Sequence, residues 1–337
     1  MFEKSERLKK LPPYLFVEID RIKNKARSEG RDIIDLGIGD PDLPTPDFVI
    51  EELCRESKDP KNHRYALDAG LFEFRSAVSK WYKNRFNVAL SAENEILPLI
   101  GSKEGIAHFP LAFINPGDVS LIPDPCYPPY KSGTIFAGGE ICLMPLLEKN
   151  GFLPDLLKID KSALKKAKVI YINYPNNPTT ACAEEGFYKD LVKFAKANNL
   201  IVISDAAYTE INFDGYEPKS FLEVDGAKDV AIEFHSLSKT CNMTGWRIGF
   251  ACGNAGLIEG LSKVKSNIDS GIFTAIQYAG VAALKGVDEY LKKVNKIYER
   301  RRDVLVEGLQ KKAGFNVSKP KATFYVWMQT PAKFSST

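Results

Sequence analysis

Short apolar runs alternate with helical patterns through the middle of this 337-residue chain. Buried apolar strands that alternate with helices are typical of an α/β domain with a mostly parallel central sheet flanked by helices. Ligands of such sheets bind at the carboxyl ends of the strands, so we expect function in the loops that follow the runs. The runs cover residues 96–100, 119–122, 141–144, 169–172, 201–204, 231–234 and 248–252.

Four longer segments have the periodicity of helices. Apolar residues recur at helical spacing over residues 17–29, 72–86 and 184–197. A long charged stretch over residues 287–313 predicts a helix that links two domains. Between the first two helices, the prolines and glycines of GIGDPDLPTP exclude a regular element and indicate an extended loop.

The last part of the chain predicts a second, smaller α/β domain. Two strand-like runs, residues 315–317 and 323–328, follow the long helix. Two strands do not make an independently stable sheet, so we expect this small domain to be incomplete at its C-terminal side. The expected division is a large domain over residues 40–282 and a small domain from residues 1–39 and 283–337.

Composition and charge exclude several classes of function. The net charge is +3, from 46 Lys and Arg against 43 Asp and Glu, which gives no reason to expect nucleic acid or a membrane surface as a partner. No run of about 18 uncharged apolar residues is present, and MFEKSERLKK lacks the apolar core of a signal peptide. The six cysteines and three histidines show no metal-ligand spacing. We therefore expect a cytoplasmic protein with reduced thiols and no protein-ligated metal.

The most specific motif is Ser236-Leu237-Ser238-Lys239, which follows an apolar run and is continued by Gly245-Trp246-Arg247-Ile248-Gly249. Hydroxyls and a guanidinium suit a phosphoester, since both donate hydrogen bonds to its oxygens. A lysine whose pKa is lowered by burial or a nearby cation attacks carbonyl groups. A surface lysine in a polar loop is the alternative, which the GWRIG continuation disfavours. Together these residues predict that Lys239 holds pyridoxal phosphate as a Schiff base.

The run at 201–204 ends in Ser204-Asp205-Ala206-Ala207-Tyr208. An acid at the end of a strand can keep a pyridine nitrogen protonated, and an Asp partner to that nitrogen is a known arrangement for pyridoxal phosphate. Tyr208 is placed to contact the ring hydroxyl. Taken alone, the motif would favour Asp205 as the cap of a following helix.

Two further loops carry polar groups after strands. In Tyr174-Pro175-Asn176-Asn177-Pro178, the prolines restrict the loop and Asn177 can donate to the phenolic oxygen, although an ordinary turn is the alternative. The bond between Asn177 and Pro178 is expected to be cis. Gly101-Ser102-Lys103 opens a helix whose N-terminus suits an anion, and Tyr127 can stack on a ring or simply pack in its loop.

Together these residues resemble the class I/II aminotransferases, the fold type I pyridoxal-phosphate enzymes, from the first residues to about residue 330. Four segments resemble the LL-diaminopimelate aminotransferase subfamily in particular: LPPYLFVEIDRIK, IDLGIGDPDLPTP, GSKEGIAHFPLAFINPGD and SLSKTCNMTGWRIGF. Those enzymes exchange an amino group between LL-diaminopimelate and 2-oxoglutarate in lysine and cell-wall precursor biosynthesis.

The resemblance implies a role for each matching residue. Lys239 carries the cofactor and shuttles the proton, and Asp205 pairs with the ring nitrogen. Gly39 would help bind the substrate α-carboxylate, and Asn177 would also contact the substrate. Tyr14 and Asp68 would read the distal end of the substrate, Asp68 from the partner of a homodimer. The remaining cofactor contacts are Asn177 and Tyr208 at the phenolic oxygen, Tyr127 on the ring, Ser102, Lys103, Ser236, Ser238 and Arg247 around the phosphate, and Tyr65 reaching the partner subunit's phosphate.

The resemblance also implies a segment beyond Thr337 with an arginine for the substrate α-carboxylate. Poor turnover by this chain is therefore one expectation, and a role as a weakly active dimer partner is an alternative. Transamination of aspartate or an aromatic amino acid, or another pyridoxal-phosphate reaction such as β-elimination, is a second alternative. A dehydrogenase is disfavoured because no GxGxxG follows an early strand.

Overall fold

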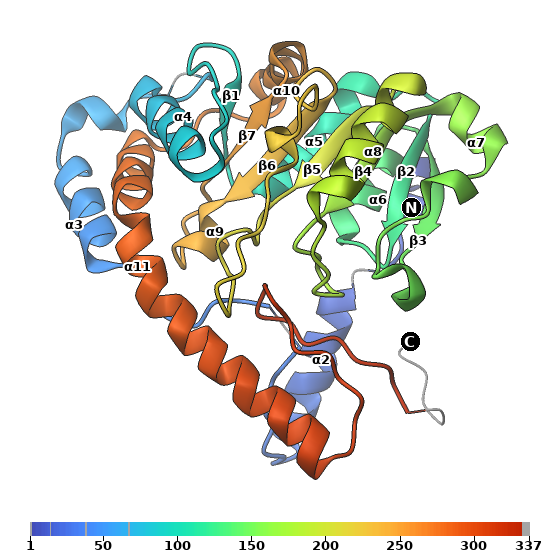
Figure 1. Ribbon diagram of the computed structural model, residues 1–337. Helices are drawn as coiled ribbons and strands as arrows, with labels where there is room; N and C mark the ends of the chain where they lie inside the picture. Colours follow the sequence, from blue (N-terminus) through green and yellow to red (C-terminus); the bar gives the residue numbers. More distant parts are fainter. Residues whose placement is uncertain (1, 14, 38, 67, 332–337) are drawn as a thin grey trace. The chain divides into compact units, whose positions relative to one another are not determined.

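The computed structural model describes residues 2–13, 15–37, 39–66 and 68–331 (Figure 1). They fall into two compact units, Met1–Asp40 and Pro41–Thr337, each of which is described by itself. Among the described residues, no helix has the length and apolarity needed to cross a membrane.

The first unit contains two helices, α1 (Glu6–Lys9) and α2 (Leu15–Ser28). The Ser5 side chain caps α1 by accepting the backbone N–H of Leu8. The sequence pattern predicted α2 to within two residues at its start. Lys23 of α2 pairs with Asp35 at 2.8 Å, which fastens the following irregular segment to the helix.

All seven apolar runs form strands of one sheet in the second unit. The strand order is β1-β7-β6-β5-β4-β2-β3. Neighbours from β6 to β3 are parallel, and β7 is antiparallel to both β6 and β1, so the expected mostly parallel sheet is confirmed. The strands are β1 (Ile96–Leu99), β2 (Val119–Asp124), β3 (Glu140–Pro145), β4 (Ala167–Asn173), β5 (Ile201–Asp205), β6 (Ala231–Ser236) and β7 (Gly249–Gly253).

Helices cover both faces of this sheet (Figure 1). Successive strand residues face opposite sides, so Val169 and Tyr171 of β4 join one apolar cluster while Ile170 and Ile172 join the other. The helices of this unit are α3 (Asp47–Glu56), α4 (Phe72–Phe86), α5 (Ser102–Phe113), α6 (Pro128–Phe136), α7 (Lys161–Lys166), α8 (Glu185–Ala197), α9 (Leu237–Thr240), α10 (Ala255–Ile268) and α11 (Thr274–Glu307). The first cluster includes side chains of α5, α6 and α10, and the second includes side chains of α4, α8 and α11.

The long helix α11 starts earlier than the charge pattern predicted. It begins at Thr274 instead of residue 287 and ends at Glu307, followed by a π-helical turn over Gly308–Lys312. Its first turns contain small buried residues, and a Cβ on Gly280 would lie 2.7 Å from a ring carbon of Phe74. This close packing uses small residues in place of large apolar ones, which weakens the periodic signal.

The two strand-like runs near the C-terminal side do not form the expected strands. Within the described residues they make isolated bridges only, Val317 with Met328 and Ala322 with Asn212. The second bridge belongs to a backbone contact within the same unit, where Phe213 N–H donates to Lys321 O at 2.9 Å and Thr323 N–H to Ile211 O at 2.8 Å. Hydrogen bonds to a distant part of the chain, and not a small separate sheet, therefore pair the backbone polar groups of this segment.

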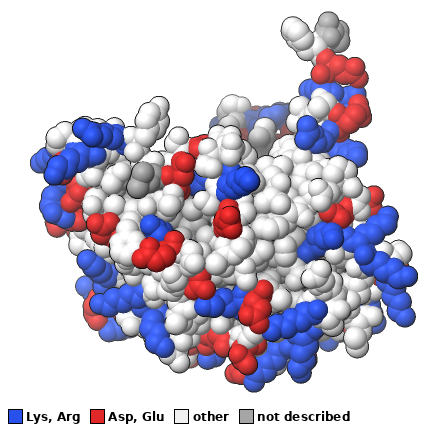
Figure 2. Space-filling model, turned by 90° about the horizontal axis from the view of Figure 1, so that it is seen from above, with Lys and Arg blue, Asp and Glu red and all other residues white. Residues whose placement is uncertain are grey.

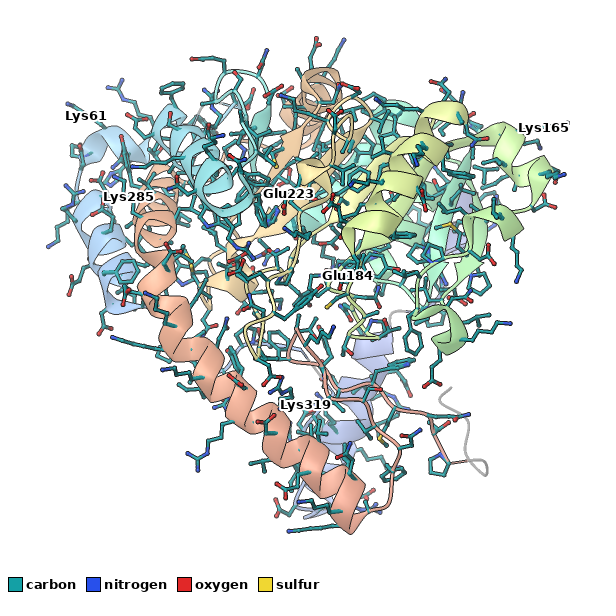
Figure 3. All side chains as sticks on the ribbon, viewed as in Figure 1. Lys61, Lys165, Glu184, Glu223, Lys285 and Lys319 are labelled. Carbon is teal, nitrogen blue, oxygen red and sulfur yellow. The ribbon has the colours of Figure 1, made fainter. Side chains whose placement is uncertain are left out.

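Ion pairs hold the same segment to α11. The buried guanidinium of Arg302 donates to the Asp214 carboxylate at 2.8 Å and to the carbonyl of Pro320 at 2.8 Å. Lys319, labelled in Figure 3, pairs with Asp303 at 3.1 Å. Residues 319–323 are therefore fixed beside the segment that follows β5.

Basic and acidic side chains are interspersed over the face shown in Figure 2. This distribution accords with the near balance of 46 basic and 43 acidic residues.

Gly105→Ala is expected to destabilise the protein by about 1–3 kcal/mol, because overpacking forces neighbours off their preferred positions. The new Cβ would lie 2.6 Å from Leu99 and 2.7 Å from Phe234. Chemical denaturation of the two proteins measures the difference. Gly186→Ala is the control: nothing lies within 4 Å of that Cβ, so the helix propensity of Ala should give unchanged or higher stability. Equal stability of Gly105→Ala and the parent would contradict the packing.

Candidate active site

Lys239 lies on a short helix that starts where β6 ends. Ser236, the last residue of β6, accepts the backbone N–H of Ser238 through its hydroxyl at 3.2 Å and so caps α9. The Lys239 side chain is partly buried, and its Nζ lies 5.7 Å from the centroid of the Phe324 ring. The amine is thus held at the carboxyl edge of the sheet, as the motif predicted.

Asp205 ends β5 with its carboxylate buried. Tyr130 of α6 donates its hydroxyl to Oδ2 at 2.7 Å, and the backbone N–H of Ala207 donates to Oδ1 at 3.3 Å. Burial raises the pKa of Asp205 to about 6, although the hydrogen bond from Tyr130 opposes the rise. Turns and not a helix follow Asp205, so a role as helix cap is excluded.

The loop after β4 is tied to Asp205. The Asn173 side chain donates to the Asp205 carbonyl at 2.7 Å and accepts the backbone N–H of Asn177 at 2.7 Å. The bond between Asn177 and Pro178 is cis, which confirms that expectation. Asn177 is therefore held near the same strand end as Asp205, and its loop is more than an ordinary turn.

Aromatic side chains from the distant C-terminal segment join Tyr208. The Tyr208 hydroxyl lies 2.8 Å from the Tyr325 hydroxyl, and its ring meets Phe324 edge-on at 5.7 Å. Burial raises the pKa of Tyr208 well above 10, so its hydroxyl stays protonated at neutral pH. Phe324 contacts both Tyr208 and Lys239. The rings of Tyr208, Phe324 and Tyr325 thus form an aromatic wall beside Lys239.

The N-terminus of α5, β6 and Arg247 converge around Gly249. A Cβ on Gly249 would lie 3.0 Å from Ser102 N, and Gly249 is the sheet partner of Ser236. Arg247 donates to the carbonyl of Thr244 at 2.9 Å, and a Cβ on Gly101 would lie 2.5 Å from Arg247 Nη2. Glycine at both positions leaves room for hydroxyl, amide and guanidinium donors to meet, which is the donor set of a phosphate site.

The other predicted residues lie in varied settings. Tyr127 is partly buried and packs edge-on against Tyr130 at 5.9 Å, while Lys103 is exposed on α5. Tyr65 is 93% exposed and Asp68 is also exposed. Gly39 belongs to the unit Met1–Asp40, and Tyr14 lies outside the described residues.

Four residues of this site were not predicted from the sequence. Asn173 is the last residue of β4, so the strand-end rule could have found it. Tyr130 lies within α6 and gives no signal of its own, because its role depends on a contact with a residue 75 positions away. Phe324 and Tyr325 were read as part of a strand-like run.

The side chains present fit pyridoxal phosphate. They offer a buried carboxylate for the ring nitrogen, a protonated phenol and an amide for the phenolic oxygen, and an amine for the aldehyde. Glycine at positions 101 and 249 lets Arg247 and the Ser102 N–H approach closely, and both are donors that suit a phosphate. The sheet and this donor set together define a fold type I pyridoxal-phosphate-dependent enzyme.

Comparison with known proteins identifies the family. Residues 31–336 match the family described as Aminotransferase class I and II, so the chain belongs to that family and is a pyridoxal-phosphate-dependent aminotransferase. A relative from Syntrophobacter fumaroxidans named LL-diaminopimelate aminotransferase is 55% identical over 335 residues, which cover 99% of this chain and 86% of that protein.

Solved structures give the same fold. Substrate-bound BacF from Bacillus subtilis has a TM-score of 0.95 at 39% identity, covering 99% of this chain and 85% of that one. A single mutant of the Thermus thermophilus aspartate aminotransferase has a TM-score of 0.92 at 28% identity, covering 100% of this chain and 87% of that one.

Asp205→Asn should stabilise the cofactor-free protein above pH 6. The folded-state pKa of Asp205 is raised from 3.8 to about 6, so the unfolded chain loses this proton first and stability falls as pH rises through that window. The variant avoids this loss, which is on the order of 3 kcal/mol. Thermal or chemical unfolding from pH 4 to pH 8 measures the difference in stability between the variant and the parent.

The matched control is Asp225→Asn, which removes an exposed carboxylate. Its stability difference from the parent should stay small and nearly flat over the same range. A pH-independent difference for Asp205→Asn would contradict the raised pKa.

Proposed function

We propose that this enzyme transfers the amino group of LL-diaminopimelate to 2-oxoglutarate in lysine and cell-wall precursor biosynthesis. The observation that carries the substrate is 55% identity over 99% of the chain to a relative named for that reaction. Relatives from Halothermothrix orenii and Maridesulfovibrio salexigens carry the same name at 52% and 55% identity, which supports the assignment.

In this proposal Lys239 and Asp205 perform the central chemistry. When bound, pyridoxal phosphate supplies an electron sink for the charge left by removal of the substrate α-proton. Lys239 holds the cofactor through its ε-amine, and once released it moves the proton at the substrate α-carbon. The Asp205 carboxylate, oriented by Tyr130, stabilises a positive charge on the ring nitrogen.

The proposal assigns the remaining cofactor contacts to side chains that follow the strand ends. Tyr208 and Asn177 donate to the phenolic oxygen, and Tyr127 stacks on the ring. The high pKa of Tyr208 keeps its proton available for that hydrogen bond. The phosphate is held by Ser102, Lys103, Ser236, Ser238 and Arg247.

We further propose that two chains form a homodimer with shared sites in the cytoplasm. Tyr65 would reach the partner's phosphate site and Asp68 the distal end of its substrate, and the exposure of both residues in the single chain supports this. Gly39, Tyr14 and Asn177 are also proposed as substrate contacts. The proposed domains are residues 40–282, and residues 1–39 with 283–337.

A second candidate is transamination of aspartate by the same site. The TM-score of 0.92 to an aspartate aminotransferase supports it, although that identity is 28% against 55%. Both reactions use the same cofactor residues, so the amino donor distinguishes them.

Lys239→Ala should lose covalent attachment of the cofactor. Borohydride reduction of the parent protein with pyridoxal phosphate, followed by peptide mass spectrometry, is expected to find the modification on Lys239. Lys285→Ala, which removes an exposed lysine of α11, should be modified like the parent. Stoichiometric modification that persists in Lys239→Ala would rule out this lysine as the attachment site.

LL-diaminopimelate should be the preferred amino donor. With 2-oxoglutarate as acceptor, kcat/KM for LL-diaminopimelate is expected to exceed that for aspartate or phenylalanine by about a hundredfold or more, since a site that pairs distal polar groups rejects donors that lack them. Spectroscopic half-reactions with each donor make the same comparison without the acceptor. A higher kcat/KM for aspartate would favour the second candidate.

A further inference from the structure

A buried lysine is paired with the helix that opens the proposed phosphate site. Lys265 of α10 has a side chain that is 2% exposed, and its Nζ lies 3.0 Å from Glu104 Oε1 and 2.5 Å from Asp269 Oδ1. Glu104 stands two residues after Ser102, in the first turn of α5. An ammonium this deeply buried must be paired, so the contact joins α10 to the start of α5.

The other oxygen of Glu104 holds the backbone before that helix. Glu104 Oε2 accepts the N–H of Ile100 at 2.6 Å, and the Ile100 carbonyl accepts Arg247 Nη2 at 3.5 Å. The backbone N–H and carbonyl of Ile100 are thus each held by a side chain, the N–H by Glu104 and the carbonyl by Arg247. The next residue, Gly101, turns the chain with a φ of +74° and brings Ser102 N–H toward Gly249.

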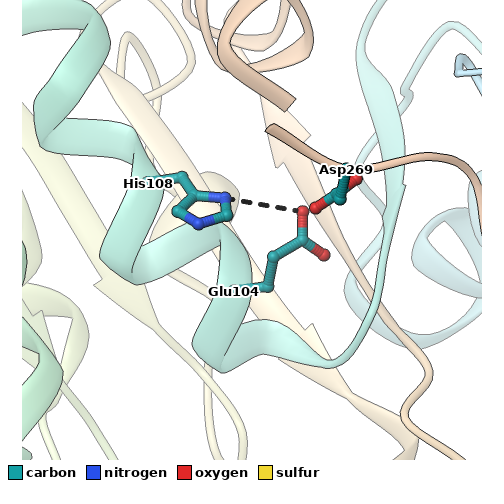
Figure 4. Close-up of side chains that lie close together, drawn as sticks. All are labelled: Glu104, His108 and Asp269. Carbon is teal, nitrogen blue, oxygen red and sulfur yellow. Dashed lines mark ion pairs between the residues drawn. The ribbon is translucent and has the colours of Figure 1, made fainter. Parts of the chain in front are cut away.

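Glu104, His108 and Asp269 lie close together, as Figure 4 shows, and such a group resembles a metal site. The ammonium of Lys265 already supplies the positive charge to both carboxylates. His108 Nδ1 is 3.8 Å from Glu104, and burial lowers the pKa of His108, so its imidazole adds no charge at neutral pH. The cluster therefore serves the protein's own chain instead of a cation.

We propose that Lys265 is a positioning residue for the cofactor phosphate, acting through Glu104 and the Ile100 amide to fix the turn at Gly101 and Ser102. The inference rests on the proposed phosphate contact of Ser102. Lys265 itself touches neither the cofactor nor the substrate in this arrangement.

The ionisation of Glu104 depends on this lysine. Burial raises the pKa of Glu104 to about 7, while Lys265 is the strongest group acting in the other direction; the Ile100 amide also lowers the pKa, and Asp269 raises it. Loss of Lys265 removes the strongest effect that lowers this pKa, so a larger fraction of the carboxyl is protonated at neutral pH. A neutral carboxyl is a weaker acceptor for the Ile100 N–H, which loosens the turn.

Lys265→Met tests the proposal by comparing two ligands. Pyridoxal phosphate and pyridoxal differ only in the phosphate, so a positioned phosphate loop affects one and not the other. Titration calorimetry of the cofactor-free proteins should give a Kd for pyridoxal phosphate raised about tenfold in Lys265→Met, as expected for one charge-assisted hydrogen bond. The Kd for pyridoxal should change less than about twofold.

Two matched variants complete the experiment. Lys263→Met removes an exposed lysine of the same helix and should leave both Kd values unchanged. Lys265→Arg keeps the charge and should recover most of the affinity for pyridoxal phosphate. If Lys265→Met does not fold, Glu104→Gln replaces it, with about a threefold loss confined to pyridoxal phosphate because the amide oxygen is a weaker acceptor.

Each outcome decides the proposal. Unchanged binding of pyridoxal phosphate by the folded variant overturns it, as does an equal loss for both ligands, which would indicate general destabilisation. Failure of the parent protein to bind pyridoxal phosphate would instead refute the proposed phosphate site itself.

Discussion

The buried carboxylate of Asp205 is the constraint on which the site depends. A carboxylate in this setting costs free energy unless it is hydrogen-bonded and paired. Tyr130 and the Ala207 amide supply part of that stabilisation, and in the proposed function a protonated ring nitrogen would supply the opposite charge. Asn173 ties the neighbouring loop to the same residue. In the proposed function, the cofactor and the strand ends would therefore stabilise each other.

The sequence allowed the strand-end residues of this site to be predicted. Lys239, Asp205 and Ser102 each follow an apolar run. All seven runs form strands of one sheet, and β1, β5 and β6 run in the same direction, which places their carboxyl ends at one edge. Local patterns are enough to predict these residues, because a short stretch of sequence shows both the hydrophobic periodicity of a strand and the strand end where ligands bind. The substrate roles of Gly39, Tyr14 and Asp68 have no such local basis and stay predictions.

The features that could not be predicted from the sequence depend on contacts between distant segments. Tyr130 acts through Asp205, and Phe324 reaches Lys239 because residues 321–323 bond to the backbone around Ile211. The same bonding engages the backbone at the start of residues 323–328, which do not form the predicted strand. The early start of α11 was missed because small residues such as Gly280 allow close packing without an apolar pattern.

The aromatic wall has a consequence for how the protein is made. Phe324 lies 85 positions after Lys239, and the intervening chain includes the whole of α11. On the ribosome, the sheet and the reactive lysine emerge long before their aromatic cover. A nascent chain can thus present the Lys239 amine at the strand ends before Phe324 lies beside it. Cofactor captured at that stage would be sheltered only when the late segment docks beside Tyr208.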